Sequence, residues 1–430
     1  MNVLCAIAAE SVEARDGVAN KTSSRPSCST MAFATAVGVG APVRSSLVPT
    51  RHHELTRSRP LGGRVAPTAA AAVRMDAGAT SSGAPATPKP VGIGIIGCGR
   101  IGQVHAKAIS STLGAKLVAV ADPFEKFGRS VAAEFSTTWV ADWKELVANP
   151  DVDGVVIGSP TPFHAEQIIA CAEAGKAIFC EKPISNDLAT IDSCLEVVER
   201  TGVKLLVGFQ RRFDSNFQKV KSVVASGAIG DVRTFTITSR DPSPPPADYL
   251  AKSGGIFLDM ASHDFDMARF VCGAEIESVY VTGAAIESAA QEAGDLDTVV
   301  TVLKMSNGAF GTIENSRRCG FGYDQRIEVF GGKGSVVGGN KSADTVTVST
   351  EAGIGAGLPY DFFMDRYAAA YTGIMGAFVT MVAQDGEVPV GGADGRAPIV
   401  AAKAAQLSVK EGRLVRLDEV DLVKAAAGVA

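Results

Sequence analysis

The chain has 430 residues, 46% of them hydrophobic, and is therefore long enough for two domains with large cores. A formal net charge of −5 argues against a nucleic-acid partner, and no stretch approaches the roughly 20 consecutive apolar residues of a membrane span. The eight cysteines form no C-x-x-C pair and no cluster with histidine, so the sequence predicts free or buried thiols and no metal site.

The N-terminal region has the composition of an organellar import signal. In residues 18–75, eight lysines and arginines stand against one acidic residue, Glu54, and the segment is rich in Ser, Thr and Ala. We expect residues 1–75 to be a transit peptide for the plastid (chloroplast) stroma, and residues 76–90 to be a polar linker. The alternatives are mitochondrial import, a cytoplasmic location, and a disordered tail that has no targeting function. Met31 is an alternative start.

The first element that carries chemistry is a short apolar run, 91–96, followed by glycines in G-x-G-x-x-G spacing. In such a turn Gly97 permits the sharp bend, Gly99 lets the backbone approach a pyrophosphate, and Gly102 lets a helix pack closely on the sheet. A second apolar run ends in Asp122, twenty residues beyond Gly102, where a carboxylate can accept hydrogen bonds from ribose hydroxyls. The glycine pattern alone is weak, but with the acidic residue it predicts a dinucleotide-binding turn. A helix cap at Asp122 is the weaker alternative.

Short buried-type strands alternate with helical segments up to Phe209. We expect strands at 91–96, 117–121, 139–140, 155–157, 177–180 and 204–209, with helices at 125–135, 143–147 and 188–200 and after the loop 158–166. This alternation predicts a doubly wound parallel sheet of the Rossmann type over residues 91–212.

After Arg211 strand-like runs follow one another with few helices. They are 232–239, 276–283, 298–305, 309–316, 326–330, 335–338 and 345–349. One helix is expected at 256–271, after the proline-rich loop DPSPPPADY, and a late helix at 362–383. The sequence therefore predicts an α+β domain over residues 213–430, built on a large, mostly antiparallel open sheet.

Candidate catalytic residues follow the expected strand 177–180 and lie in the expected helix 256–271. Lys182 can hold a substrate hydroxyl beside a nicotinamide ring, although a surface lysine is the alternative, and the bond before Pro183 can be cis. Asp259 and His263 are four residues apart and would share one helix face. A histidine beside a carboxylate is a candidate proton acceptor, and the alternative is a pair that only stabilises the helix.

Further polar groups are available where the two halves join. Arg211 and Arg212 are adjacent, and such a pair can clamp a polar substrate or bind acidic neighbours. Tyr323 and the polar loop around Asp241 can add a hydroxyl and a carboxylate from the second half.

Seven motifs together carry a family resemblance. They are GCGRIGQVHA (97–106), ADP (121–123), PTPFHAE (160–166), EKPIS (181–185), GFQRRFD (208–214), GGIFLDMASHD (254–264) and YDQRIEVFG (323–331). From about residue 91 to 417 the chain resembles the Gfo/Idh/MocA oxidoreductases, and within them it looks most like the inositol dehydrogenases. One departure lies in the late helix, where Gly373 and Ile374 stand near the position of an expected glutamate.

The resemblance implies that Lys182, Asp259 and His263 are the catalytic residues. It implies NAD as the cofactor, bound by residues of the glycine turn and of the loops after successive strands: Gly97, Gly99, Arg100, Ile101, Gly102, Asp122, Ser159, Pro160, Thr161, His164, Glu181 and Lys182. The pocket for a polyol or sugar substrate would be lined by Arg212, Asp241 and Tyr323. Because relatives commonly assemble through the outer face of the second sheet, a homodimer or homotetramer is also implied.

We therefore expect an NAD-dependent dehydrogenase that oxidises a secondary hydroxyl of a cyclitol, such as myo-inositol, or of a sugar to the ketone. NAD should be preferred to NADP, because a carboxylate at Asp122 repels a 2′-phosphate. One alternative is a glycosidase or lyase that keeps its nucleotide as a resident redox group. The other is a sensor that binds nucleotide and sugar without catalysis, and the presence of Lys182 and His263 argues against it.

Overall fold

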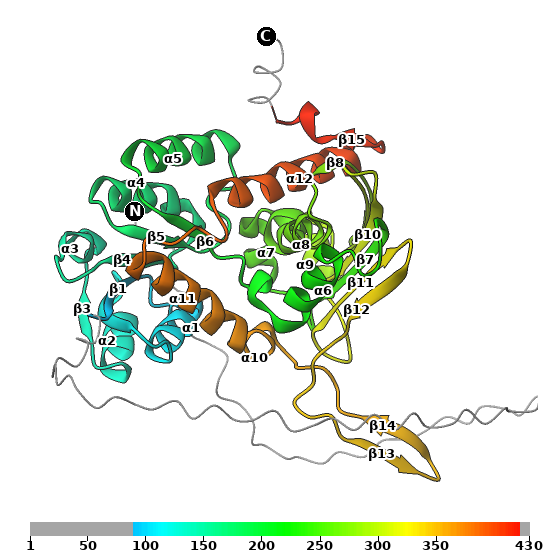
Figure 1. The fold of residues 1–430 in the computed structure, drawn as a ribbon, viewed down its shortest axis with the longest axis horizontal. Helices are drawn as coiled ribbons and strands as arrows, with labels where there is room; N and C mark the ends of the chain where they lie inside the picture. The colour runs from blue at the N-terminus through cyan, green and yellow to red at the C-terminus, as the bar shows by residue number, and fades with distance from the viewer. Residues whose placement is uncertain (1–88, 422–430) are drawn as a thin grey trace, which may run out of the picture. The chain divides into compact units, whose positions relative to one another are not determined.

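The structure, a computed structural model, describes residues 89–421 of the chain. The expected transit peptide and most of the expected linker lie outside the described residues, as do residues 422–430. Figure 1 shows the fold of these residues.

The first half is built on a six-stranded sheet in the order β3-β2-β1-β4-β5-β6, in which all neighbouring strands run parallel. The strands are β1 (Val91–Ile96), β2 (Ala115–Ala121), β3 (Thr138–Val140), β4 (Gly154–Ile157), β5 (Ala177–Cys180) and β6 (Leu205–Val207). The helices are α1 (Arg100–Ser110), α2 (Glu125–Glu134), α3 (Trp143–Ala148), α4 (His164–Glu173) and α5 (Leu188–Thr201), with a 3₁₀ turn at Thr161–Phe163.

Every residue of β1 and β4 is buried, as expected of strands covered on both faces. The strand order reverses between β1 and β4, and in such sheets ligands bind beyond the carboxyl ends of the strands at that point. The predicted doubly wound fold is confirmed, and it places the glycine turn at the switch point.

The second half contains a seven-stranded sheet in the order β12-β11-β7-β10-β9-β8-β15, antiparallel except where β7 meets β10. Its strands are β7 (Val232–Arg240), β8 (Ile276–Ala284), β9 (Thr298–Met305), β10 (Phe310–Ser316), β11 (Asp324–Gly331), β12 (Gly334–Gly338) and β15 (Val415–Arg416). A separate hairpin is formed by β13 (Thr347–Thr350) and β14 (Gly353–Ala356). The predicted mostly antiparallel sheet is thus confirmed.

Two of the helices expected in the second half differ from the prediction. Its helices are α6 (Ser215–Ala225), α7 (Ala247–Ser253), α8 (Ser262–Cys272), α9 (Ser288–Ala293), α10 (Phe363–Arg366), α11 (Ala368–Ala383) and α12 (Gly392–Glu411), with 3₁₀ turns at Gln210–Phe213 and Leu417–Glu419. The segment expected as one helix at 256–271 begins with a π-helical turn, Phe257–Ala261, before α8. The late helix is interrupted at Tyr367 between α10 and α11.

Helix α12 was not predicted, and with α11 it joins the two halves. It packs on α5 and β6 on one side and on α8 and β8 on the other, while α11 packs on α1 and β1 (Figure 1). A helix buried on several sides has no single apolar stripe, and Pro398 inside α12 weakens its helical pattern further. In α11 the position near the expected glutamate, Ile374, is fully buried in the hydrophobic core.

Candidate active site

The glycine turn between β1 and α1 has the geometry that a pyrophosphate requires. Gly97 has a φ of +96°, which side chains rarely tolerate. A Cβ on Gly102 would lie 1.9 Å from the Gly97 carbonyl oxygen, so the helix can approach the turn only because residue 102 is glycine. A Cβ added to Gly99 would have no other atom within 4 Å, so the space beside this residue is open. No side chain forms a capping hydrogen bond at the N-terminus of α1. A phosphate can therefore reach the free N–H groups of the first helical turn.

The neighbouring positions of the turn differ in exposure. Arg100 is exposed, and its guanidinium carbon lies 5.8 Å from the centre of the Phe362 ring. Ile101 is half-buried against Gly158, at the end of β4. The first turn of α1 thus presents one cationic side chain to solvent and one apolar side chain to the sheet.

Asp122 is held beside the glycine turn by backbone groups. One carboxylate oxygen accepts a hydrogen bond from the Cys98 N–H at 2.8 Å, and the other accepts one from the Phe124 N–H at 2.8 Å. Each oxygen retains a further lone pair that a ribose hydroxyl can use. Burial, and then the negative charge of Asp122, raise the pKa of the Cys98 thiol to about 12, so this cysteine is neutral.

His164 connects the loops that follow β4 and β5. Its ring nitrogens lie 2.8 Å from the carbonyl oxygens of Ser159 and Pro183, and the side chain is 1% exposed. Burial lowers its pKa. The structure therefore places His164 beneath the expected cofactor loop as a support, while Pro160 is exposed and Thr161 half-buried on its surface.

Lys182 reaches from the end of β5 to the second half of the chain. Its Nζ donates a hydrogen bond to the backbone oxygen of Asp259 at 2.9 Å, and the peptide bond before Pro183 is cis. Glu181 faces the other way, because its Oε1 lies 2.6 Å from Nε2 of the fully buried His105 on α1. Its Oε2 accepts a hydrogen bond from the Lys182 N–H. Glu181 thus links the cofactor helix to the lysine loop.

The expected pairing of Asp259 with His263 is not formed. The Asp259 carboxylate accepts hydrogen bonds from the Tyr249 hydroxyl and from Arg317, each at 3.1 Å. Among the described residues no hydrogen bond or ion pair joins it to His263. The Asp259 carboxylate is instead held by partners from outside the segment, and a π-helical turn, Phe257–Ala261, replaces the expected regular winding here.

His263 instead lies among an aromatic ring and cations. Its ring packs edge-on against Phe209 with 5.8 Å between the centres, and its buried Nδ1 has no hydrogen-bond partner among the described residues. Burial, and then the positive charges of Lys182 and Arg211, hold the pKa of His263 well below its ordinary value. The imidazole is therefore neutral at pH 7 and free to accept a proton.

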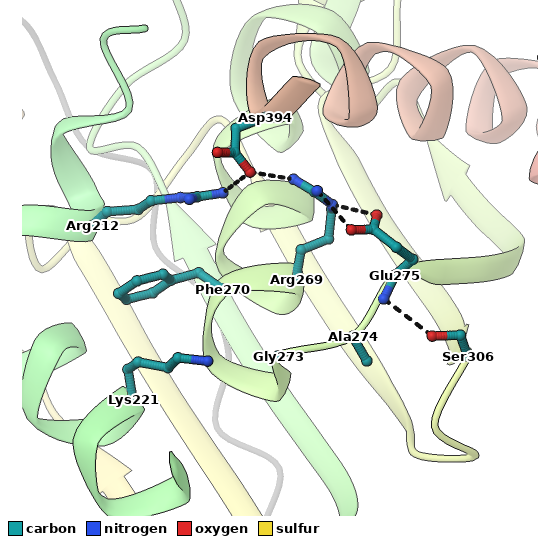
Figure 2. Close-up of a pocket in the computed structure, with 9 residues that line it drawn as sticks. All are labelled: Arg212, Lys221, Arg269, Phe270, Gly273, Ala274, Glu275, Ser306 and Asp394. Atoms are coloured by element: carbon teal, nitrogen blue, oxygen red, sulfur yellow. Dashed lines mark hydrogen bonds and ion pairs between the residues drawn. The ribbon is translucent and has the colours of Figure 1, made fainter. Parts of the chain in front are cut away.

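Arg211, and not Arg212, lies among the candidate substrate groups. Arg211 is buried, pairs with Asp264 at 2.6 Å and donates to the hydroxyl of the buried Tyr323 at 3.2 Å. Arg212 is bound by Asp266 and Asp394. Figure 2 shows it in a different pocket, of about 450 Å³, opposite Arg269. Consecutive residues of a 3₁₀ turn point about 120° apart, so the two arginines face different sides.

Asp241 directly follows the end of β7. Its carboxyl group interacts electrostatically with the charges of Arg317, Asp259 and Arg211. Burial raises its pKa to about 6, an effect that the nearby Arg317 opposes. Sequence reasoning missed Tyr249 and Arg317, which hold Asp259. Arg317 is 1% exposed, but it follows β10 in an ordinary polar stretch, NSRRCG, and no motif signals its burial.

We expect Arg211→Lys to raise KM for the substrate about ten-fold or more, because a lysine cannot bind Asp264 and Tyr323 with one planar group. The matched variant Arg212→Lys should lower Tm and change KM less than about three-fold. Steady-state kinetics and thermal melts of both variants measure these effects. A larger increase in KM for Arg212→Lys than for Arg211→Lys would instead indicate that Arg212 lies in the substrate pocket, as the sequence predicted.

Within residues 89–421, no helix is long and apolar enough to cross a membrane. No group of three or more His, Cys, Asp and Glu side chains within that range is placed to hold a metal ion. The cysteines described are all buried and unpaired.

The first half is a Rossmann domain whose glycine turn can bind a pyrophosphate, and the second half supplies a neutral histidine. This combination defines a dinucleotide-dependent oxidoreductase. Residues 91–209 match the family described as oxidoreductase family, NAD-binding Rossmann fold, and residues 217–337 match the GFO/IDH/MocA C-terminal domain.

Relatives match over most of their own length. An inositol 2-dehydrogenase of Rhizobium meliloti is 46% identical, covering 76% of this chain and 99% of the relative. A myo-inositol 2-dehydrogenase of Thermotoga maritima is 44% identical, with the same coverage. The structure of scyllo-inositol dehydrogenase from Lactobacillus casei with bound NAD(H) and scyllo-inositol is 30% identical, with a TM-score of 0.70, and covers 76% of this chain and 99% of that one. The chain belongs to the Gfo/Idh/MocA oxidoreductase family.

Proposed function

We propose that the protein oxidises one secondary hydroxyl of a cyclitol, myo-inositol or a close isomer, to the ketone with NAD as the oxidant. The observation that carries this is the environment of His263, an imidazole kept neutral by burial beside Lys182 and Arg211. A neutral imidazole next to two cations can take a proton from an alcohol whose oxygen the cations stabilise. The inositol dehydrogenases among the relatives support the same reaction.

Each residue has a separate task in this reaction. Bound NAD supplies the hydride acceptor. Lys182 holds the reacting oxygen, and His263 takes the hydroxyl proton. Asp259, fixed by Tyr249 and Arg317, presents its backbone oxygen to Lys182 and so sets the position of the ammonium group.

The decisive experiment is a panel of cyclitols and aldoses, assayed for NADH by absorbance. We expect NADH to accumulate with myo-inositol or one of its isomers, with at least about a ten-fold higher kcat/KM than with any aldose. A resident-cofactor glycosidase or lyase would turn over substrate without net NADH. A sensor would bind nucleotide and sugar with no turnover, so either result would contradict the proposal.

The cofactor preference follows from Asp122. We expect NAD to be preferred over NADP by about ten-fold or more in kcat/KM, because the carboxylate would repel a 2′-phosphate. Arg129 on α2, the nearest guanidinium along the chain, is already paired with Glu125 at 2.6 Å and lies over the Trp139 ring. Asp122→Ser should reduce the preference, and equal kinetics with both nucleotides for the unaltered chain would contradict it.

We also propose that residues 1–75 direct the chain into plastids, on the basis of their basic, Ser- and Ala-rich composition. A chain that starts at Asp76 should fold and keep its full activity. Residues 1–75 fused to a fluorescent protein should carry it into plastids, with a fusion to residues 76–150 as the control. Mitochondrial fluorescence would reassign the address, and an insoluble truncation would make the segment part of the fold.

We propose, finally, that the outer face of the seven-stranded sheet joins copies of the chain. Exposed apolar side chains cover several of its strands: Tyr280, Val300, Val302, Phe310, Phe330 and Val337. Exposed apolar side chains repeated across neighbouring strands of one sheet face favour an interface. Val302→Lys should lower the mass measured by light scattering, whereas Lys144→Ala, at an exposed position on α3 in the first half of the chain, should not. A monomeric unaltered chain would refute this interface.

A further inference from the structure

A buried hydrogen bond connects α1 with the loop that follows β5, and the reaction as described above makes no use of it. Nε2 of His105 lies 2.6 Å from Oε1 of Glu181, and the histidine is fully buried. In the sheet, β4 lies between β5 and β1, the strand that leads into α1. The bond therefore joins the two sides of the point where the strand order reverses, which is where a nucleotide binds in such sheets.

The surroundings hold Glu181 and His105 in one arrangement. The rings of Phe179 and Tyr371 pack edge-on against the imidazole, with 4.8 and 5.7 Å between the ring centres. On the side of β6, a Cβ on Gly208 would lie 3.0 Å from Oε2 of Glu181 and 3.1 Å from its Cα. The carboxylate therefore has room only because residue 208 carries no side chain.

Stability alone does not account for a histidine at position 105. Its second ring nitrogen, Nδ1, is buried and has no hydrogen-bond partner among the described residues. An unsatisfied buried nitrogen costs free energy that an apolar side chain of similar size would avoid. The bond from Nε2 to Glu181 is the one feature that the imidazole provides and a leucine would not.

Glu181 passes this restraint on to Lys182. Its Oε2 accepts a hydrogen bond from the Lys182 backbone N–H at 3.2 Å, and the lysine Nζ donates to the Asp259 backbone oxygen at 2.9 Å. The backbone end of the lysine is thus tied to α1 through Glu181, and its ammonium end is tied to the second half of the chain. The geometry between the bound nucleotide and the oxygen that Lys182 holds depends on both attachments.

We propose that His105 and Glu181 are positioning residues, which fix Lys182 relative to the nucleotide on α1 and so set the alignment for hydride transfer. Because Oε2 accepts the Lys182 N–H as a carboxylate oxygen, Oε1 is an acceptor as well, and Nε2 of His105 is the nitrogen that donates. Neither residue touches the reacting atoms. The effect on rate rests on the proposed dehydrogenase reaction, whereas the effect on the Lys182 backbone does not.

The first test measures the restraint on Lys182 directly and needs no substrate. His105→Leu keeps an apolar side chain of similar size but has no donor, and His105→Gln keeps an N–H near the position of Nε2. In the full-length chain we expect hydrogen exchange at the Lys182 amide to become at least about ten-fold faster with Leu and to stay within about three-fold with Gln. Unchanged exchange at Lys182 in His105→Leu would overturn the proposal, whatever the protein catalyses.

The second test measures turnover in the NADH assay with myo-inositol. His105→Leu should lower kcat about 10- to 100-fold, while KM and NAD affinity stay within about three-fold, because only the alignment of bound groups is lost. His105→Gln should restore kcat to within about three-fold of the unaltered chain. A loss of kcat in both variants together with a lower melting temperature would identify a packing role and contradict the proposal.

A double variant tests whether the two residues act in series. Glu181→Gln should lower kcat as well, and the loss in the double variant with His105→Leu should be smaller than the product of the two single losses. Ile109→Val, at another fully buried position of α1, is the control for packing and should lower the melting temperature without changing kcat. Losses that multiply would show that His105 does not act through Glu181.

Failure of this proposal is distinguishable from failure of the proposed function. If the unaltered chain formed no NADH with any cyclitol, the proposed reaction would be wrong, and exchange at Lys182 would still decide whether His105 restrains the lysine. If the unaltered chain formed NADH and His105→Leu retained its full kcat, the reaction would stand and the positioning role would be refuted.

Discussion

Replacement of His263 by Asn is expected to lower kcat by a factor of about 10² to 10⁴, the usual contribution of a general base. Asn is similar in size and can still form hydrogen bonds, but it cannot accept the hydroxyl proton. NAD affinity should change little, because the nucleotide site is formed by the glycine turn and Asp122. Turnover, NAD affinity and melting temperature of this one variant measure the three effects separately.

The opposite result would identify a structural histidine. A packing role against Phe209 predicts a lower melting temperature with turnover preserved in the folded protein. Near-normal kcat in well-folded His263→Asn would therefore transfer the base role to Lys182. The matched variant Phe209→Leu removes the aromatic contact but keeps the imidazole, so it should lower stability and leave kcat within about ten-fold of the unaltered chain.

The depressed pKa of His263 determines how activity and stability depend on pH. Because the folded chain keeps the imidazole neutral, oxidation should remain constant through pH 6.5 and fall only below the lowered pKa. The unfolded chain protonates this histidine near pH 6.5, so stability should decrease as the pH falls below that value. The Asn variant should lose this share of the pH dependence. If the rate of oxidation already decreased on acidification before the pH had reached 6.5, the assignment of His263 as the base would be contradicted.

Substitution of Gly102 by Ala should abolish nucleotide binding, with a loss of affinity of about 100-fold or more. The new Cβ would lie 1.9 Å from the Gly97 carbonyl oxygen. Neither atom can rotate away, because the carbonyl oxygen belongs to the backbone and the Cβ is bonded directly to it. The turn must open or α1 must move away from the sheet, so we expect the free energy of unfolding to fall by about 2–3 kcal/mol. Calorimetric titration with NAD and chemical denaturation measure the two effects.

Gly99→Ala is the matched control for that variant. Gly99 has a φ of −69°, which alanine adopts without strain, and there is open space beside it. We expect an unchanged free energy of unfolding and an NAD affinity about 10- to 100-fold weaker, because the methyl group occupies the approach of the pyrophosphate. Normal NAD binding by Gly99→Ala would place the pyrophosphate elsewhere. A stable Gly102→Ala protein with normal affinity would show that the turn can relax.

The sequence alone was sufficient for features determined by local rules. Continuous apolar runs identified the strands buried on both faces, and alternation from Val91 to Phe209 predicted the doubly wound sheet. The positions of Gly97 and Gly102 follow from backbone sterics, which act within a few residues. Lys182 and His263 were found because they stand in motifs, and their roles remain predictions.

The tertiary structure decided which side chains meet. Arg317 reaches Asp259 across 58 residues of chain, and Arg211 reaches Tyr323 across 112, distances over which no local period acts. Tyr249 and Arg317 hold the Asp259 carboxylate in place of His263. The 3₁₀ turn directs Arg211 and Arg212 to different sides, because it deviates from the regular 3.6-residue winding on which sequence patterns rely. Helix α12 remained unpredicted for a related reason: its neighbours come from both halves, so its burial depends on contacts that exist only after the chain has folded.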